Sequence, residues 1–132
     1  MATIKKFEDL EIWQLARKLN IKLYPYLKLM YHDKNFALCR QIDAASGSVM
    51  DNIAEGFSRD GNKELIQFLS IAKGSLGEVR SQLYRLFDRD LIKQEAFENL
   101  QEDCVLLTGK ISSFINYLKR SEYKGVKFKA EP

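Results

Sequence analysis

The stretch DNIAEGFSRDGN, residues 51–62, decides how the rest of the chain is arranged. Long segments with apolar residues at helical spacing lie on both sides of it. Gly56 suits the left-handed position that ends a helix, and Asn62 suits the N-cap position that begins the next one. The sequence therefore predicts a corner between two helices here, with Glu55 and Arg59 paired across it.

Apolar periodicity on both sides of this corner predicts four helices. They are expected at about residues 7–30, 36–55, 63–88 and 93–120, in a single domain 1–132 that closes with a basic tail, 121–132. Pro25 has no backbone donor, so it is expected to kink the first helix or to break it near Tyr24. Four long amphipathic helices joined by short loops predict an all-α fold, an up-down-up-down antiparallel four-helix bundle.

The third helix carries the most regular core stripe. Its members are Leu65, Phe68, Leu69, Ala72, Leu76, Val79, Leu83, Leu86 and Phe87. Ser75 and Glu78 lie beside this stripe and are expected to be polar groups at the edge of the core that fix the helix register. Asn52 is expected to make a similar hydrogen bond at the core edge of the second helix.

Composition places the chain among ordinary globular proteins, with 132 residues, 45% hydrophobic and 30% charged. No apolar run approaches the ~18 residues of a membrane span, and the N-terminus lacks the apolar core of a signal peptide. Cys39 and Cys104 fall on helical apolar stripes and are expected to be reduced core thiols. We therefore expect a cytoplasmic protein without membrane association.

Motifs for common enzyme chemistry are absent from the sequence. His32 is the only histidine, which excludes the paired Glu-x-x-His motifs of di-iron bundles. No phosphate-binding glycine loop, zinc-protease motif or serine nucleophile motif is present. The sequence thus predicts a protein that is not an enzyme, with no metal and no cofactor.

Basic residues offer a candidate surface for nucleic acid, on a chain with a net charge of +3. Arg59 and Lys63 flank the start of the third helix, where its dipole favours phosphate. Lys73 and Arg80 are one heptad apart near Tyr84, a pattern that suits single-stranded RNA. The full candidate set is Arg59, Lys63, Lys73, Arg80, Tyr84, Lys119, Arg120, Lys124 and Lys127. The alternative is a Glu55–Arg59 ion pair and a solvated basic face.

Two surfaces favour self-association. The first helix carries a second apolar strip, formed by Leu10, Trp13, Ile21 and Tyr24. The third helix carries a groove of small residues, formed by Ser70, Gly74, Gly77 and Ser81. Small residues permit close approach of another helix backbone, within the bundle or across a subunit boundary. The run of small residues 44–48, with Gly47 among them, likewise predicts close packing of another helix at the middle of the second helix.

Three segments together resemble a known family. They are FEDLEIWQLARKL (7–19), NIAEGFSR (52–59) and FLSIAKGSLGEVRSQL (68–83), and the resemblance covers roughly residues 7–118. The family comprises bacterial four-helix bundle proteins encoded within intervening sequences of large-subunit ribosomal RNA genes; the accessory protein of diversity-generating retroelements is a more distant relative. The matching positions are Asn52, Ile53, Ala54, Glu55, Gly56, Arg59, Phe68, Leu69, Ile71, Ala72, Gly74, Ser75, Glu78, Gln82 and Leu83.

This resemblance implies a bundle that assembles as a ring, a homopentamer, and that binds structured RNA or an RNA-handling partner. Asp43 departs from the family pattern, which often has a basic residue there, and this weakens an RNA contact from the second helix. The leading functional hypothesis is a non-enzymatic, ring-forming RNA-binding or RNA-partner adaptor. The alternative is a protein–protein adaptor or oligomeric scaffold that does not bind nucleic acid.

Overall fold

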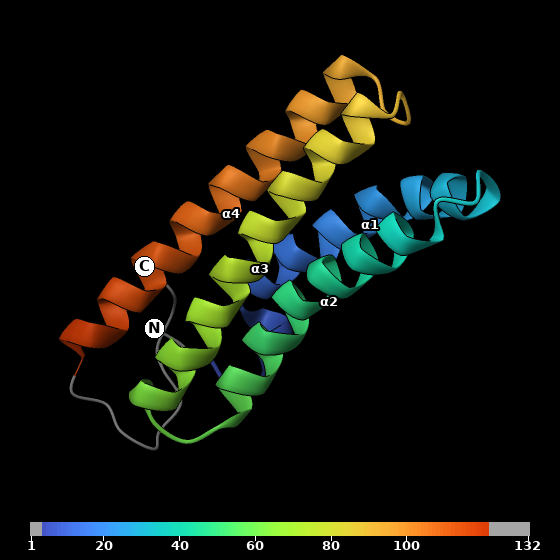
Figure 1. Cartoon of the computed structure of the whole chain (residues 1–132). Helices are drawn as coiled ribbons and strands as arrows, with labels where there is room; N and C mark the ends of the chain where they lie inside the picture. The colour runs from blue at the N-terminus through green and yellow to red at the C-terminus, as the bar shows by residue number, and fades with distance from the viewer. Residues whose placement is uncertain (1–3, 122–132) are drawn as a thin grey trace.

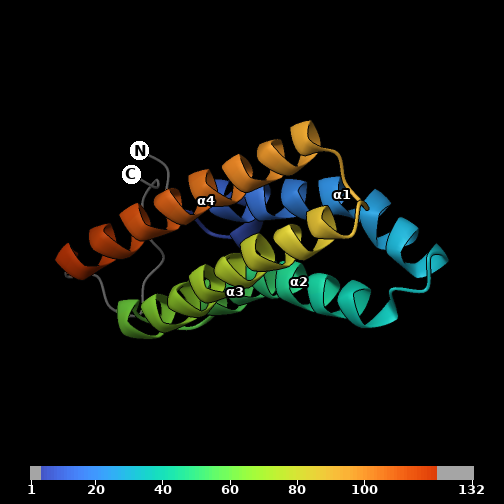
Figure 2. The same cartoon turned by 45° about the horizontal axis from the view of Figure 1, so that its top comes forward.

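The computed structural model describes residues 4–121, which form an all-α bundle (Figure 1). A short 3-10 turn, η1 (Phe7–Asp9), precedes the four helices. The helices are α1 (Glu11–His32), α2 (Phe36–Ser58), α3 (Asn62–Asp88) and α4 (Gln94–Arg120). Successive helices run in opposite directions, and α4 returns to pack against α1 (Figures 1 and 2). The predicted four-helix bundle is therefore confirmed.

The first helix begins later and ends later than the sequence predicts. Leu10 is extended (φ −75°, ψ 127°) and connects the 3-10 turn to α1. Its side chain is fully buried, so it belongs to the core rather than to an exposed apolar strip. Pro25 lies inside α1, which continues unbroken to His32, so of the two predicted effects, a kink or a break, the break does not occur. Pro25 is exposed, where water can hydrate the carbonyl left without a donor, and the helix changes direction along its second half (Figure 2).

The core consists of one stripe from each helix, as periodicity predicts. The α3 stripe is buried except for Phe68 and Phe87, which are partly exposed. The fully buried side chains of largest volume come from all four helices and include Leu23, Ile53 and Phe114. This continuous apolar interior leaves the outward faces of the helices to carry any function.

The corner between α2 and α3 differs from the prediction in its construction. Helix α2 continues through Gly56 to Ser58, and the left-handed residue is Gly61, with φ 97°. Gly56 is required for a different reason: a Cβ atom there would lie 2.7 Å from Cβ of Phe68 and 3.1 Å from Cδ1 of Leu65. Periodicity reveals which face of a helix is apolar, but not how closely two helices approach. The predicted helix-ending role of Gly56 is therefore wrong.

Asn62 also has a role other than the predicted cap. It is the first residue of α3, Gly61 occupies the N-cap position, and no side chain caps the helix. The Asn62 side chain is buried, and its Nδ2 donates to the carbonyl oxygens of Leu118, at 3.0 Å, and Ser121, at 3.4 Å. Asn62 therefore holds the start of α3 against the end of α4.

Candidate nucleic-acid interface

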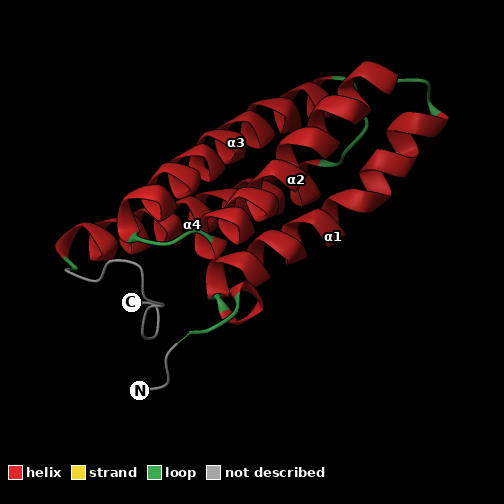
Figure 3. Ribbon diagram, turned by 90° about the horizontal axis from the view of Figure 1, so that it is seen from below, coloured by secondary structure: helices red, strands yellow, loops and turns green. Residues whose placement is uncertain are grey.

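The bond made by Asn62 gathers four predicted basic residues at one end of the bundle. Arg59 and Lys63 flank the start of α3, and Lys119 and Arg120 form the last turn of α4. All four side chains are exposed. We refer to Arg59, Lys63, Lys119 and Arg120 as the basic end. It lies where the α2–α3 loop and the final turn of α4 meet (Figure 3).

Arg59 is the best-defined member of the basic end. Its Nη2 lies 3.2 Å from Oε1 of Glu55, so the expected pairing of these two residues is present. Its guanidinium carbon also lies 5.4 Å from the centroid of the Phe68 ring. Both members of the ion pair are about half exposed, at 51% and 55%. Glu55 therefore neutralises much of this charge. Among residues 4–121, the members of the basic end without a carboxylate in salt-bridge range are Lys63, Lys119 and Arg120.

The helix ends add fixed partial charges at this place. The first turn of α3 exposes free backbone N–H groups, which favour an anion near Lys63. The last turn of α4 favours the cations Lys119 and Arg120, because its free carbonyl groups carry partial negative charge. Asp60 and Glu64 are also exposed at this end and reduce its net positive potential.

The remaining described members of the candidate set lie elsewhere, along the line where α3 packs on α4. Arg80 Nε donates to Oε1 of Gln101 at 2.9 Å, and Gln101 Nε2 donates to the Arg80 carbonyl at 2.8 Å. Tyr84 packs edge-to-face on Phe97, with ring centroids 4.9 Å apart. Lys73 is half-buried on the same side of α3. The structure thus divides the set into two groups, and Lys124 and Lys127 lie outside the described residues.

The motif residues mostly build the contact between α2 and α3. Asn52 Nδ2 donates to the carbonyl and the hydroxyl of Ser48, both at 2.8 Å. Ser75, buried on α3, donates to the same hydroxyl at 2.8 Å. Asn52 and Ser75 therefore have the structural positions that the sequence predicts. Glu78 does not: it is exposed and lines a hollow of about 530 Å³ between α2 and α3.

The two surfaces predicted for self-association contain both buried and exposed residues. Leu10 is buried, and Trp13 is half-buried with its ring against Phe7 at 5.1 Å, so this half of the strip belongs to the chain's own interior. Ile21 and Tyr24 are exposed, at 62% and 58%. On α3 the glycine and serine groove is exposed along its whole length, as its residues Ser70, Gly74, Gly77 and Ser81 show.

The exposed glycines are not explained by a helix of the described chain that packs closely against them. A Cβ atom built at Gly47, Gly74 or Gly77 meets no atom within 4 Å. The expected close packing at the middle of α2 is present at Ser48, whose hydroxyl meets Ser75 of α3, but no helix among residues 4–121 packs closely on Gly47 itself. Of the two alternatives for the α3 groove, packing within the bundle is excluded among the described residues.

The outer face of α4 carries an exposed apolar feature that the sequence pattern does not predict. Val105 and Leu106 on α4 are 51% and 54% exposed. The available signal was the run Val105-Leu106-Leu107, because only Leu107 falls on the core stripe of α4. Gly109 follows on the same outer face and is also open.

Nucleophile and metal chemistry find little support in the described residues. Burial raises the pKa of the Cys104 thiol to about 12, with Asp103 contributing in the same direction, so the thiol is neutral at physiological pH. Cys39 is half-buried, and its Sγ donates to the Leu27 carbonyl at 3.4 Å. Residues 4–121 contain no group of three or more His, Cys, Asp or Glu side chains placed to hold a metal ion.

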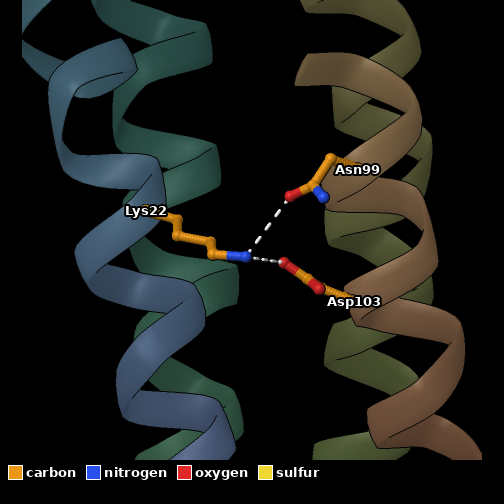
Figure 4. A network of polar contacts seen from close by, with 3 residues as sticks. All are labelled: Lys22, Asn99 and Asp103. Atoms are coloured by element: carbon orange, nitrogen blue, oxygen red, sulfur yellow. Dashed lines mark hydrogen bonds and ion pairs between the residues drawn. The ribbon is translucent and has the colours of Figure 1, made fainter. Parts of the chain in front are cut away.

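An ion pair connects the first and last helices. Lys22 Nζ on α1 lies 2.7 Å from Oδ2 of Asp103 and 3.3 Å from Oδ1 of Asn99 on α4 (Figure 4). A second pair, Lys110 to Glu11 at 3.0 Å, connects the same two helices further along. These charges are engaged within the bundle and are not free for a ligand.

Comparison with known proteins identifies the family. The family described as "23S rRNA-intervening sequence protein" matches residues 8–113, and the chain belongs to it. The fold is also that of a crystal structure of a protein with unknown function from the S23 ribosomal protein family, from Bacteroides thetaiotaomicron. That structure is 22% identical, with a TM-score of 0.74, and the alignment covers 79% of this chain and 97% of the other. None of the curated proteins compared matches the chain.

These findings confirm the resemblance to proteins of ribosomal RNA intervening sequences. Neither the family nor the structural neighbour is described as an enzyme. Within residues 4–121, no helix has both the length and the apolar character needed to cross a membrane.

Proposed function

We propose that this chain is a non-enzymatic adaptor that assembles with copies of itself into a ring and binds RNA through its basic end. The observation that carries the RNA contact is the Asn62–Leu118 hydrogen bond, because it places Lys63 beside the last turn of α4 with Lys119 and Arg120. Exposed cations at a helix N-terminus suit the phosphates of a nucleic acid backbone. Membership of a family named for ribosomal RNA intervening sequences supports RNA as the anion.

Assembly into a ring is expected to raise the affinity for RNA. Each copy contributes few cations and several nearby acids, so a single basic end binds weakly. A ring repeats the basic end around its axis, and simultaneous contacts raise the overall affinity through effective concentration. We therefore expect RNA of sufficient length to bind the assembly more tightly than short fragments.

A second candidate function rests on the exposed apolar side chains. Ile21, Tyr24, Ile71, Val105 and Leu106 are each more than half exposed, which also suits an adaptor that recognises proteins only. Such an adaptor is indifferent to RNA and to the charge of the basic end.

The experiment is a titration of fluorescently labelled structured RNA, followed by anisotropy at several salt concentrations. Replacing Lys63 and Lys119 by glutamate is expected to weaken binding at least tenfold at low salt and to flatten the salt dependence. The matched control is the pair Lys34→Glu and Lys93→Glu, which makes the same charge change on exposed residues at the other end of the bundle.

The outcomes separate the two functions. Loss of binding in the basic-end variant but not in the control supports the proposal. Equal loss in both variants indicates a general effect of net charge, and the basic end is then not the site. Wild-type protein that shows no binding even at low salt is a protein–protein adaptor instead.

A further inference from the structure

The outer face of α3 is open. Ser70, Gly74, Gly77 and Ser81 recur along it and are all exposed. The two glycines leave free space where a side chain would stand, since no atom of the chain comes within 4 Å of a Cβ built there. Open glycines inside a helix cost helix stability, by about 1 kcal/mol each relative to alanine. No packing contact at these two glycines among residues 4–121 offsets this loss of helix stability.

The side of this face that meets α2 carries an unsatisfied polar group. Gln82 lines the hollow between α2 and α3 together with Ser75 and Ser81. The residue is only 8% exposed, and its Oε1 has no hydrogen-bond partner among the described residues. A buried acceptor without a donor is costly, and a molecule that packs here with a donor group removes the cost.

The outer face of α4 has the complementary shape. Val105 and Leu106 project from it into solvent, beside a hollow of about 570 Å³ that Gly109, Ser113 and Phe114 also line. We call Val105 and Leu106 the α4 ridge. Ser113 is also exposed on this face, two turns beyond Leu106. A ridge of large side chains on one helix and a groove of small ones on another suit each other.

Charge on the two faces is also complementary. Glu95, Glu98 and Glu102 lie in the first half of α4, before the ridge, and are all exposed. None of the three has a cation within salt-bridge distance among residues 4–121.

The cations lie in the second half of α3. Arg80 and Arg85 are exposed there, and within residues 4–121 their guanidinium groups are hydrogen-bonded to neutral side chains, Gln101 and Gln41, and form no ion pair. When α3 and α4 of different copies run antiparallel, the acidic half of α4 faces the half of α3 that carries these arginines. Rotation of identical bundles about an axis along their length produces this antiparallel pairing.

We propose that the α4 ridge of one copy docks into the α3 groove of a second copy of this chain. The inference rests on the self-assembly proposed above and specifies its contact surfaces. The pairing joins two different faces, so each copy keeps one free ridge and one free groove for further neighbours. Ile21 and Tyr24 on α1 lie outside this contact.

Two variants test the pairing, each expected to inactivate one face. Leu106→Arg places a charge on the ridge, and Gly74→Leu fills the groove. Light scattering is expected to show each variant alone as the 15.3 kDa monomer at concentrations at which wild-type protein is assembled. Mixing the two is expected to restore 1:1 dimers, because the intact groove of one variant fits the intact ridge of the other.

Two controls match these changes. Gly47→Leu fills an equally open helical glycine on α2, and Ile21→Arg charges an equally exposed side chain on α1; both are expected to stay assembled. Circular dichroism confirms that each variant is folded, which is expected because leucine favours a helix more than glycine does.

The outcomes separate this inference from the proposed function. Assembled Leu106→Arg and Gly74→Leu proteins, or monomers that fail to pair when mixed, overturn the inference and leave the ring and the RNA contact standing. Monomeric wild-type protein overturns the ring together with this pairing. Loss of RNA binding in variants of the basic end is a separate result and has no bearing on the docking of α4 on α3.

Discussion

The contact between α2 and α3 and the contact between α1 and α4 are built differently. We call them the α2–α3 seam and the α1–α4 seam. The α2–α3 seam is close and has no ion pair between its two helices among residues 4–121, with Gly56 against Phe68 and the hydroxyl of Ser75 bonded to that of Ser48. The α1–α4 seam is less extensive and is connected by ion pairs between half-exposed side chains, such as Lys22 with Asp103 (Figure 4).

The difference shows where specificity of packing resides. A close seam depends on shape, because a side chain that is one methyl group too large must move a helix. A charged seam depends on long flexible side chains that tolerate small shifts and compete with water and salt. We therefore expect the α2–α3 seam to determine how the helices are arranged in the bundle. The α1–α4 seam is expected to tolerate small shifts between its two helices.

The largest effect is expected at Gly56. In Gly56→Ala the new Cβ would stand 2.7 Å from Cβ of Phe68, which cannot move without its helix. We expect the free energy of unfolding to fall by about 2 kcal/mol in urea titrations. Gly47→Ala is the matched control, because its site is open, and it is expected to gain about 0.5 to 1 kcal/mol from helix propensity alone. Equal gains in both proteins would contradict the close packing of this seam.

A smaller effect is expected for the hydroxyl pair. Ser75→Ala removes the donor to Ser48 while Asn52 still donates to that hydroxyl. The free energy of unfolding is expected to fall by about 1 kcal/mol, with no dependence on salt because no charge is involved. A double-mutant cycle with Ser48→Ala measures the coupling between the two hydroxyls. A coupling energy of zero would show that the hydrogen bond does not stabilise the seam.

The smallest effect is expected in the α1–α4 seam. Lys22→Met keeps the length of the side chain and removes its charge, and the side chains of Lys22 and Asp103 are 48% and 32% exposed. We expect a loss of about 0.5 kcal/mol at low ionic strength, disappearing in 1 M salt as the charges are screened. Asp103→Asn should behave alike. A loss that persists in high salt would place Lys22 in packing rather than in an ion pair.

The sequence predicts the fold well because apolar periodicity records which side of each helix is buried. It predicts less of the contacts between helices. Lys22 and Asp103 are 81 residues apart, and nothing local in either segment indicates that they meet. At Gly56, sequence spacing addresses only the local conformation of the backbone, so it predicts a helix end there and not the close approach of α3.

The candidate site was predicted by residue type but not by arrangement. Residue type predicts all four members of the basic end, but their gathering at one end depends on the bond from Asn62 to α4, which joins residues 56 apart. Lys73 and Arg80 lie along α3, as their heptad spacing predicts, and are separate from the basic end. The α4 ridge was missed because Val105 and Leu106 sit next to true core residues, and hydrophobicity alone does not separate the two.

Asn62 has a further consequence for local unfolding. Helix ends open and close more readily than helix centres, and each end ordinarily does so independently. Here the carbonyls of Leu118 and Ser121 are held by a side chain from the start of α3, so opening the last turn of α4 also releases the first residue of α3. Amide protons at these two distant helix ends should therefore exchange with solvent as one cooperative unit.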